Sequence, residues 1–255
     1  MTLPFANVQV FDRESEFLDS ALRLWRRALA EGLRRRKPFL AALSGGRTPI
    51  PFYQRLAGQK GTDYWRAIHL FLVDERFGPP DHPESNGRMI TETLVRPAGI
   101  PPENVHLIPL NKENAEQSAR AYEERLRDFF RLNRGGFPAF DFILLGIGED
   151  GHTASLFPGT PALEEGERAV AAVRLDAIRR DRVTLTLPVL NRAARVVFLV
   201  QGEEKAEIIG RIIAGKDSTL PAARVQPARG RAIFLLDRSA GRQLSSHLQG
   251  NRGIS

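Results

Sequence analysis

The sequence predicts an α/β fold with a mostly parallel sheet flanked by helices, and two observations carry that prediction. Short apolar runs of strand length recur along the chain, and segments with the apolar spacing of helices separate several of them. Strands that alternate with helices form βαβ units, whose strands pair in parallel. The chain has 255 residues and shows no internal repeat or linker-like tract, so we expect a single domain over 1–255.

The first helix is expected over 14–36, because apolar residues recur there at the spacing of one helix face. Those residues are Leu18, Ala21, Leu22, Trp25, Leu29 and Leu33. Lys37-Pro38 ends the helix, and the apolar run 39–43 follows as a buried strand. A second helix is expected to begin with Thr48 as its N-cap residue and Pro49 in its first turn.

The same alternation continues toward the end of the chain. The further strand-like runs are 68–73, 105–108, 140–145, 182–187, 195–200 and 232–236. The further helix-like segments are about 86–95, 114–131 and 203–214. In such sheets a ligand binds outside the carboxyl ends of the strands, near the point where the strand order reverses. Polar loops that directly follow these strands are therefore the candidate site.

Charge and residue usage narrow the classes of function. The formal net charge is +7 and the isoelectric point is near 10.3, yet the basic clusters are short and no aromatic residues interleave with them. We interpret most of this charge as solvated surface, with any functional share attracting a phosphorylated substrate, and we expect no nucleic-acid partner. Cysteine is absent, which excludes disulfides, thiolate catalysis and cysteine-bound metals.

The sequence also shows no membrane segment and no leader. No apolar run approaches the roughly 20 residues that span a bilayer, and the N-terminal residues lack the pattern of a secretory signal. We therefore expect no membrane partner and a cytoplasmic location. Paired histidines at a metal-binding spacing are absent as well, so we expect no metal site.

The first polar loop is Ser44-Gly45-Gly46-Arg47-Thr48, directly after a strand. Its glycines let backbone N–H groups turn toward an anion, and the helix that follows adds partial positive charge, so a phosphate fits there. The loop is neither a Walker A sequence nor a nucleophile elbow. A tight turn that simply needs glycine explains this loop equally well.

The second loop is Val73-Asp74-Glu75-Arg76, which runs on to Ser85-Asn86. Arg76 has the planar fork that grips a phosphate or a carboxylate. Adjacent carboxylates on an extended chain point to different faces and do not form an acid/base pair by themselves. Taken alone, this loop favours the plainer interpretation of a solvated segment with an internal ion pair.

The third loop runs from Gly146 to Gly159 and contains Gly146-x-Gly148-x-x-Gly151. This spacing matches the dinucleotide-binding fingerprint, but Glu149 and Asp150 would repel a pyrophosphate, and the fingerprint normally marks the first βα turn.

His152 stands out within this loop, at the start of an expected helix and one glycine after Asp150. A carboxylate that close orients an imidazole to accept a proton from water, which favours a general base. The other histidines are interpreted as structural: His69, His82, His106 and His247.

Together these loops, with Gly202-Glu203-Glu204-Lys205-Ala206 and Leu220-Pro221-Ala222, resemble the 6-phosphogluconolactonase family from about residue 40 to 225. The resemblance implies a Rossmann-like α/β fold shared with glucosamine-6-phosphate deaminases. It also implies hydrolysis of 6-phospho-D-glucono-1,5-lactone to 6-phosphogluconate in the pentose phosphate pathway, without a metal or an organic cofactor.

The site residues that the resemblance implies fall into two groups. His152 is expected to act as general base and Asp150 to orient it. The expected substrate-binding residues are Ser44, Gly45, Gly46, Arg47, Arg76, Asn86, Gly151 and Lys205. One further arginine is expected at the site, with the choice left open among Arg174, Arg179 and Arg180. Closure of the loops 78–85 and 160–168 over the substrate is left open too.

Two other functions compete with the lactonase. A glucosamine-6-phosphate deaminase or isomerase would use the same phosphate loop, but the deaminases look like they carry an extra acid after the histidine, where this chain has Ala154-Ser155-Leu156. A non-catalytic sugar-phosphate sensor would need a DNA-binding segment, and residues 1–38 offer little beyond one helix. The sequence leaves the oligomeric state open, with a monomer favoured.

Overall fold

The computed structural model describes residues 6–35, 37–59, 62–175, 180–215 and 217–244, and its centre is a seven-stranded sheet. All strand pairs of this sheet are parallel, in the order β1-β10-β9-β6-β2-β3-β5. Its strands are β1 (Ala6–Phe11), β2 (Phe39–Leu43), β3 (Ile68–Leu72), β5 (Val105–His106), β6 (Phe142–Leu145), β9 (Arg195–Val200) and β10 (Arg231–Asp237). The predicted α/β class is confirmed.

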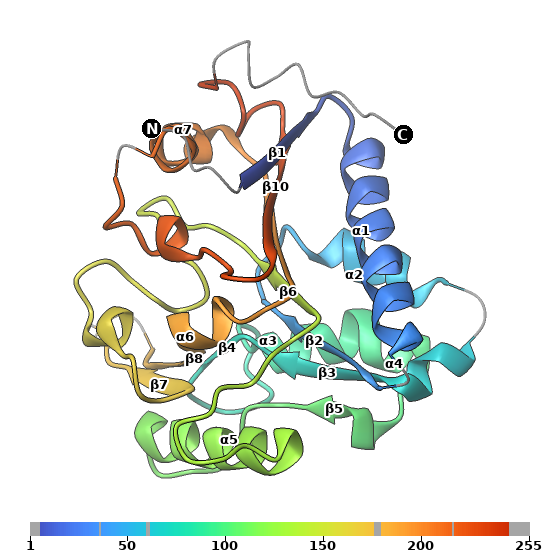
Figure 1. The fold of residues 1–255 in the computed structure, drawn as a ribbon, viewed down its shortest axis with the longest axis vertical. Helices are drawn as coiled ribbons and strands as arrows, with labels where there is room; N and C mark the ends of the chain where they lie inside the picture. The colour runs from blue at the N-terminus through green and yellow to red at the C-terminus, as the bar shows by residue number, and fades with distance from the viewer. Residues whose placement is uncertain (1–5, 36, 60–61, 176–179, 216, 245–255) are drawn as a thin grey trace.

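Helices cover both faces of this sheet. Figure 1 shows α1 and α2 on one side of the strands and α7 on the other, with α5 below β5. The helices are α1 (Glu14–Arg34), α2 (Ile50–Ala57), α3 (Asn86–Ile90), α4 (Arg96–Ala98), α5 (Ala115–Phe130), α6 (Leu187–Leu190) and α7 (Ala206–Ile213). The short helical turns are η1 (Thr62–Ala67), η2 (Thr91–Val95, a π-helical turn), η3 (Pro102–Asn104), η4 (Pro161–Glu164), η5 (Glu203–Lys205) and η6 (Pro221–Arg224).

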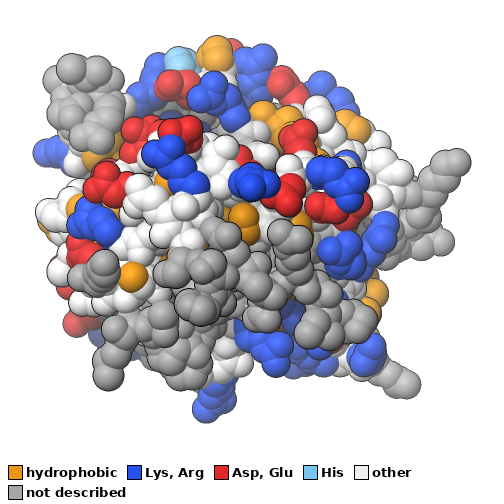
Figure 2. Space-filling model, turned by 90° about the horizontal axis from the view of Figure 1, so that it is seen from above, with side chains coloured by type: hydrophobic (Ala, Val, Ile, Leu, Met, Phe, Trp, Pro, Cys, Tyr) orange, Lys and Arg blue, Asp and Glu red, His pale blue; other side chains and the backbone are white. Residues whose placement is uncertain are grey.

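The face of the molecule drawn in Figure 2 is polar and mixed in charge. On the face seen in Figure 2, Lys and Arg side chains alternate with Asp and Glu, and hydrophobic side chains are scattered among them. This pattern agrees with the interpretation of the positive charge as mostly solvated surface. None of the helices in the described part of the chain combines the length and apolar character that a membrane span needs.

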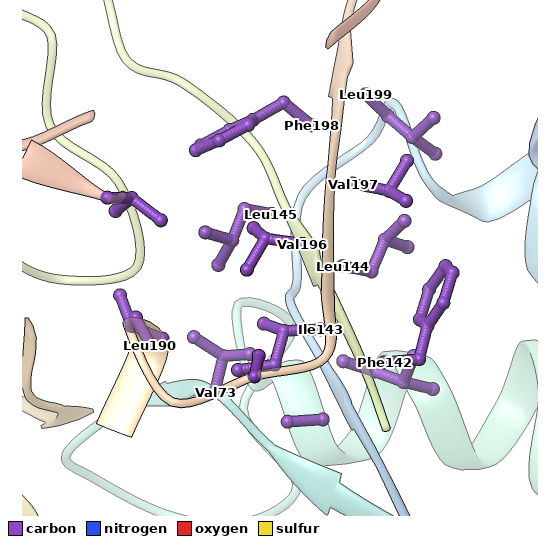
Figure 3. Close-up of a cluster of buried hydrophobic side chains, with 14 of the residues drawn as sticks. Val73, Phe142, Ile143, Leu144, Leu145, Leu190, Val196, Val197, Phe198 and Leu199 are labelled. Atoms are coloured by element: carbon purple, nitrogen blue, oxygen red, sulfur yellow. The ribbon is translucent and has the colours of Figure 1, made fainter. Parts of the chain in front are cut away.

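The core follows from strands that are apolar on both sides. Along β6 and β9, alternate residues point to opposite faces, as Figure 3 shows for Phe142 and Leu144 on one side and Ile143 and Leu145 on the other. All four side chains are buried. A strand with helices on both faces needs apolar residues at every position, which explains why these strands read as continuous apolar runs.

A second sheet was not foreseen as a separate unit. It is antiparallel, in the order β4-β8-β7, and consists of β4 (Asp74–Arg76), β7 (Val170–Val173) and β8 (Arg182–Leu185). The strand predicted over 182–187 therefore exists but leaves the parallel sheet. Its apolar content had suggested the parallel sheet, whereas its pairing with the polar strand β4 is a long-range contact that local pattern does not reveal.

Two local predictions were wrong. Helix α2 begins at Ile50, and Pro49 holds the N-cap position with no side-chain cap, so Thr48 does not cap it. In place of a side-chain cap, the Ile50 N–H donates to the Arg47 carbonyl in a tight turn before the helix. Leu33 is exposed, because it lies in the last turn of α1, where the helix no longer packs fully on the sheet.

The order of the strands reverses between β2 and β6. From β2 the chain adds β3 and β5 in one direction, and it then returns to place β6 and β9 on the other side. The loops that follow β2 and β6 therefore leave the same edge of the sheet at adjacent strands. This is the switch point at which parallel sheets bind ligands, and the first and third polar loops lie there.

Candidate functional site

The glycine loop after β2 packs against the second loop. A Cβ added at Gly45 would lie 1.7 Å from the Asn86 side-chain oxygen, so only glycine allows this approach. The Ser44 hydroxyl donates to the Leu144 carbonyl over 2.8 Å, and the Tyr53 hydroxyl donates to the Ser44 carbonyl over 2.6 Å. Gly46 has a φ of 95°, in the region that favours glycine. The loop is therefore held on both sides.

The second loop is a strand with a buried carboxylate, so the interpretation as a solvated segment was wrong. Glu75 accepts hydrogen bonds from the backbone N–H groups of Arg76, Asn86 and Gly87 and from the Ser85 hydroxyl, at 2.7–3.0 Å. Burial raises the pKa of Glu75, although these donors oppose the rise. The carboxylate ties β4 to the start of α3.

Asn86 and Arg76 form a hydrogen-bonded cluster beside Glu75. The Asn86 amide donates to the Asp74 carbonyl over 2.8 Å, and the Arg76 guanidinium donates to the Asn86 oxygen and, over 3.1 Å, to the Glu84 carbonyl. The Asp74 carboxylate in turn accepts a hydrogen bond from the Ser155 hydroxyl over 2.7 Å. Asp74 thus connects the second loop with the third.

His152 and Asp150 form a close pair. The His152 Nδ1 lies 2.5 Å from the Asp150 carboxylate, which also accepts from the His152 backbone N–H over 3.1 Å. Partial burial alone would raise the pKa of Asp150, but the hydrogen bonds from His152 outweigh it and the pKa falls. With Nδ1 engaged, Nε2 is the ring nitrogen left to exchange a proton.

The backbone around His152 shapes this pair. A Cβ at Gly148 would lie 2.0 Å from the His152 Nδ1, so glycine is needed there. The His152 ring also packs on Phe157, with 4.4 Å between ring centroids. The helix expected to start at His152 was wrong: the segment forms turns, because Gly151 and Ala154 take left-handed φ values of 80° and 53°.

Lys205 approaches the loop of His152 and Asp150 from the end of β9, the strand next to β6. It ends η5, directly after β9, and its Nζ lies 3.6 Å from the Glu149 carboxylate. The Lys205 side chain is mostly buried, whereas the Glu149 side chain is mostly exposed. A buried lysine beside the glycine loop supplies the positive charge that a phosphate group needs.

Two adjoining cavities of about 330 and 420 Å³ collect these residues. The first is lined by seven of the eight predicted substrate-binding residues and by His152, and the second by His152, Asp150, Arg76 and Lys205. The seven are Ser44, Gly45, Gly46, Arg47, Arg76, Asn86 and Lys205. Gly151 lines neither cavity; its carbonyl accepts from the Ala222 N–H over 3.1 Å, behind the pocket.

Sequence reasoning missed Arg182, which lines the second cavity from β8. No local signal marks it, because an arginine in a short strand is an ordinary surface residue. Of the three arginines considered, Arg174 is exposed and lines neither cavity, and Arg180 lies 3.8 Å from Glu84. Arg179 lies outside the described residues.

The other histidines in the described part of the chain, His69, His82 and His106, do not line these cavities. His69 on β3 and His106 on β5 face each other, with 3.1 Å between Nδ1 and Nε2, and both pack on Phe129. His82 stands in the loop before α3, and His247 lies outside the described residues. Within the described ranges, no group of three or more His, Asp or Glu side chains is placed to hold a metal ion.

Comparison with known proteins shows the family of the chain. A family model described as glucosamine-6-phosphate isomerases/6-phosphogluconolactonase matches residues 12–234. The chain belongs to this family. A 6-phosphogluconolactonase from Synechocystis sp. is 46% identical over 205 residues, which cover 80% of this chain and 83% of that protein. One from Nostoc sp. is 38% identical and covers 93% of this chain and 98% of that protein.

Solved structures extend the likeness to the fold. The 6-phosphogluconolactonase from Trypanosoma cruzi has a TM-score of 0.86 at 29% identity and covers 96% of this chain and 98% of that chain. A monomeric glucosamine-6-phosphate deaminase has a TM-score of 0.77 at 21% identity, covers 93% and 99%, and shows the shared fold alone. The family resemblance and the Rossmann-like, deaminase-like architecture are both confirmed.

Proposed function

We propose that the protein hydrolyses 6-phospho-D-glucono-1,5-lactone to 6-phosphogluconate, as the names of its curated relatives suggest. The observation that carries the proposal is His152, paired with Asp150, on the wall of a cavity that also holds the glycine loop and Lys205. A base for water and a place for a phosphate thus lie in one pocket. Both are what the hydrolysis of a phosphorylated lactone needs.

The base acts on water. Asp150 holds the Nδ1 proton of His152, so Nε2 accepts a proton from the water that attacks the lactone carbonyl. The carbonyl oxygen takes up negative charge, which backbone N–H groups of a glycine-rich loop stabilise. The tetrahedral intermediate then breaks the bond to the ring oxygen, and protonated His152 returns its proton to that oxygen. The catalyst ends in the state in which it began.

The phosphate gives the substrate its orientation. We place it between the loop 44–47 and Lys205, with Arg76 turned toward the sugar acid from β4. Backbone N–H groups, an ammonium group and a guanidinium act together there, and a fixed substrate keeps the lactone carbonyl near His152. Arg182 adds a second guanidinium on the side of Asp150.

The deaminase and the sensor are not favoured. The turn after His152 carries Ala154 and Ser155, and the Ser155 hydroxyl is engaged with Asp74, so this turn offers no carboxylate for ring opening of an amino sugar. A sensor would have no use for a carboxylate-oriented histidine at the pocket wall. A cytoplasmic location, a monomeric state, a single domain over the whole chain and independence from cofactors stay predictions.

The test is direct. Purified protein is mixed with freshly made 6-phosphogluconolactone, and acid release is followed beside a buffer control and beside glucosamine-6-phosphate as a second substrate. We expect acceleration of lactone opening and no release of ammonia from the amino sugar. A folded protein that leaves the rate of lactone opening at the buffer value contradicts the proposal.

A further inference from the structure

Glu149 places a negative charge inside a pocket that is otherwise suited to an anion. Its carboxylate lies 3.6 Å from the Lys205 Nζ, and both residues line both cavities. The charge of Glu149 would repel a pyrophosphate, which speaks against dinucleotide binding at this loop. In the structure the same charge faces the lysine that is proposed to hold the phosphate of the substrate.

The two side chains of this ion pair differ in how much of each is exposed to solvent. The Lys205 side chain is 18% exposed and belongs to the wall after β9, whereas the Glu149 side chain is 70% exposed on the loop after β6. Glu149 can turn into solvent with little loss of packing, and Lys205 cannot. An ion pair in which one partner is solvent-exposed is screened by water, so its separation costs little.

The other described carboxylates of the first cavity point away from Lys205 or accept hydrogen bonds from other residues, and neither forms an ion pair with this lysine. Asp74 accepts from Ser155 and from Asn86. Glu204 folds back toward the backbone of Gly202, whose added Cβ would lie 2.4 Å from its carboxylate oxygens. Glu149 is thus the carboxylate that pairs with the phosphate-binding lysine.

We propose that Glu149 is a built-in competitor of the substrate phosphate: it neutralises Lys205 in the empty pocket and swings out when a phosphate dianion enters. The inference rests on the proposed function only for the identity of the natural ligand. A dianion that also meets the loop 44–47 outcompetes one carboxylate, whereas a monoanion gains nothing from the exchange. Glu149 therefore selects for phosphate, and its return to Lys205 helps the phosphorylated product to leave.

Inorganic phosphate is the probe that tests this exchange. Its Kd is measured by calorimetry at pH 8 for the wild type and for Glu149→Gln, which keeps the size of the side chain and removes its charge. We expect phosphate to bind about two- to five-fold more tightly to the variant, the range set by an exposed ion pair. In lactone hydrolysis the same variant should have a lower KM and stronger inhibition by 6-phosphogluconate.

Two further variants separate the ion pair from bulk charge. Glu124→Gln makes the same charge change on the exposed side of α5 and should leave the Kd of phosphate unchanged. In a Lys205→Met background, the effect of Glu149→Gln should largely disappear. The proposal is overturned if Glu124→Gln lowers the Kd of phosphate as much as Glu149→Gln does. It is also overturned if Glu149→Gln lowers that Kd equally in the absence of Lys205, since either result assigns the effect to net charge.

The remaining outcomes are equally decisive. Unchanged or weaker phosphate binding by Glu149→Gln overturns the proposal, and weaker binding would make Glu149 a residue that positions Lys205. A wild type that binds no phosphate overturns it as well. In a further outcome, the protein fails to open the lactone while Glu149→Gln binds phosphate more tightly. That result would support Glu149 as the competitor of phosphate and would refute only the proposed function.

Discussion

Two histidine pairs in this chain show how a partner decides what an imidazole can do. His152 pairs with a carboxylate on a loop at the switch point of the sheet, and His69 on β3 pairs with His106 on the edge strand β5. A carboxylate orients its imidazole and stabilises the positive charge that a base acquires. A second imidazole penalises that charge: burial and then His69 lower the pKa of His106 to about 4. The first pair suits proton transfer and the second suits packing.

The difference also lies in what surrounds each pair. His69 and His106 stack among aromatic rings, and His106 lies 4.1 Å from Phe71, centroid to centroid. His152 packs on Phe157 and opens on two cavities. A histidine in a glycine-rich loop at the carboxyl end of a strand therefore deserves a functional interpretation that a histidine within a strand does not.

Among changes to the residues around His152, Gly148→Ala gives the largest expected effect. In Gly148→Ala, the added methyl group must displace the imidazole, and a misplacement of about 1 Å can cost roughly 100-fold in rate. Gly166→Ala is the matched control, since no atom lies within 4 Å of its added Cβ. Steady-state kinetics on the lactone should show the loss for Gly148→Ala alone; equal rates would mean that His152 needs no fixed position.

Asp150→Asn removes the charge of the partner and keeps its shape. The amide can no longer stabilise the imidazolium, so we expect kcat to fall about 10- to 100-fold, as is typical for groups that orient a reacting residue. KM should change little, because Asp150 lines the second cavity and not the one that holds the glycine loop. A loss confined to KM would place Asp150 in substrate binding instead.

The second pair should show its effect in stability against pH. The pKa of both His69 and His106 is lowered by burial, so below the ordinary value of about 6.5 the unfolded chain binds more protons than the folded one. The free energy of unfolding should therefore fall as the pH drops from about 6.5 to about 4. Denaturant unfolding at several pH values measures this, and His106→Asn should flatten the slope whereas His82→Asn should keep it.

Most continuous apolar runs could be predicted from the sequence, although the short apolar strand β7 was missed, and polar strands could not be predicted. The strands at 39–43 and 195–200 were predicted to the residue, because both faces of each are buried. β1 was missed since Asn7 and Gln9 interrupt its apolar pattern, and β4 was missed because it consists of charged residues. Charged residues form a strand there only because Ser85, Asn86 and Gly87 satisfy Glu75 from a distant segment.

The same distinction, between local sequence pattern and contacts between distant segments, applies to the candidate site. Motifs that are local in the chain pointed to His152, Asp150 and the glycine loop, and the structure brings these residues to two adjoining cavities. Contacts between segments remained invisible: the approach of Gly45 to Asn86, the pair of Glu149 with Lys205, and the arrival of Arg182 from β8. The helix expected after His152 failed because left-handed turns at Gly151 and Ala154 replace it.

The central claim is that the histidine paired with a carboxylate, and not the histidine paired with a histidine, performs the chemistry. The decisive measurement is the rate of 6-phosphogluconolactone opening by His152→Ala beside His106→Ala, with both variants shown to be folded. We predict that His152→Ala loses about 10²- to 10⁴-fold, the usual contribution of a general base, and that His106→Ala keeps the wild-type rate. A His152→Ala variant as fast as the wild type would contradict the account.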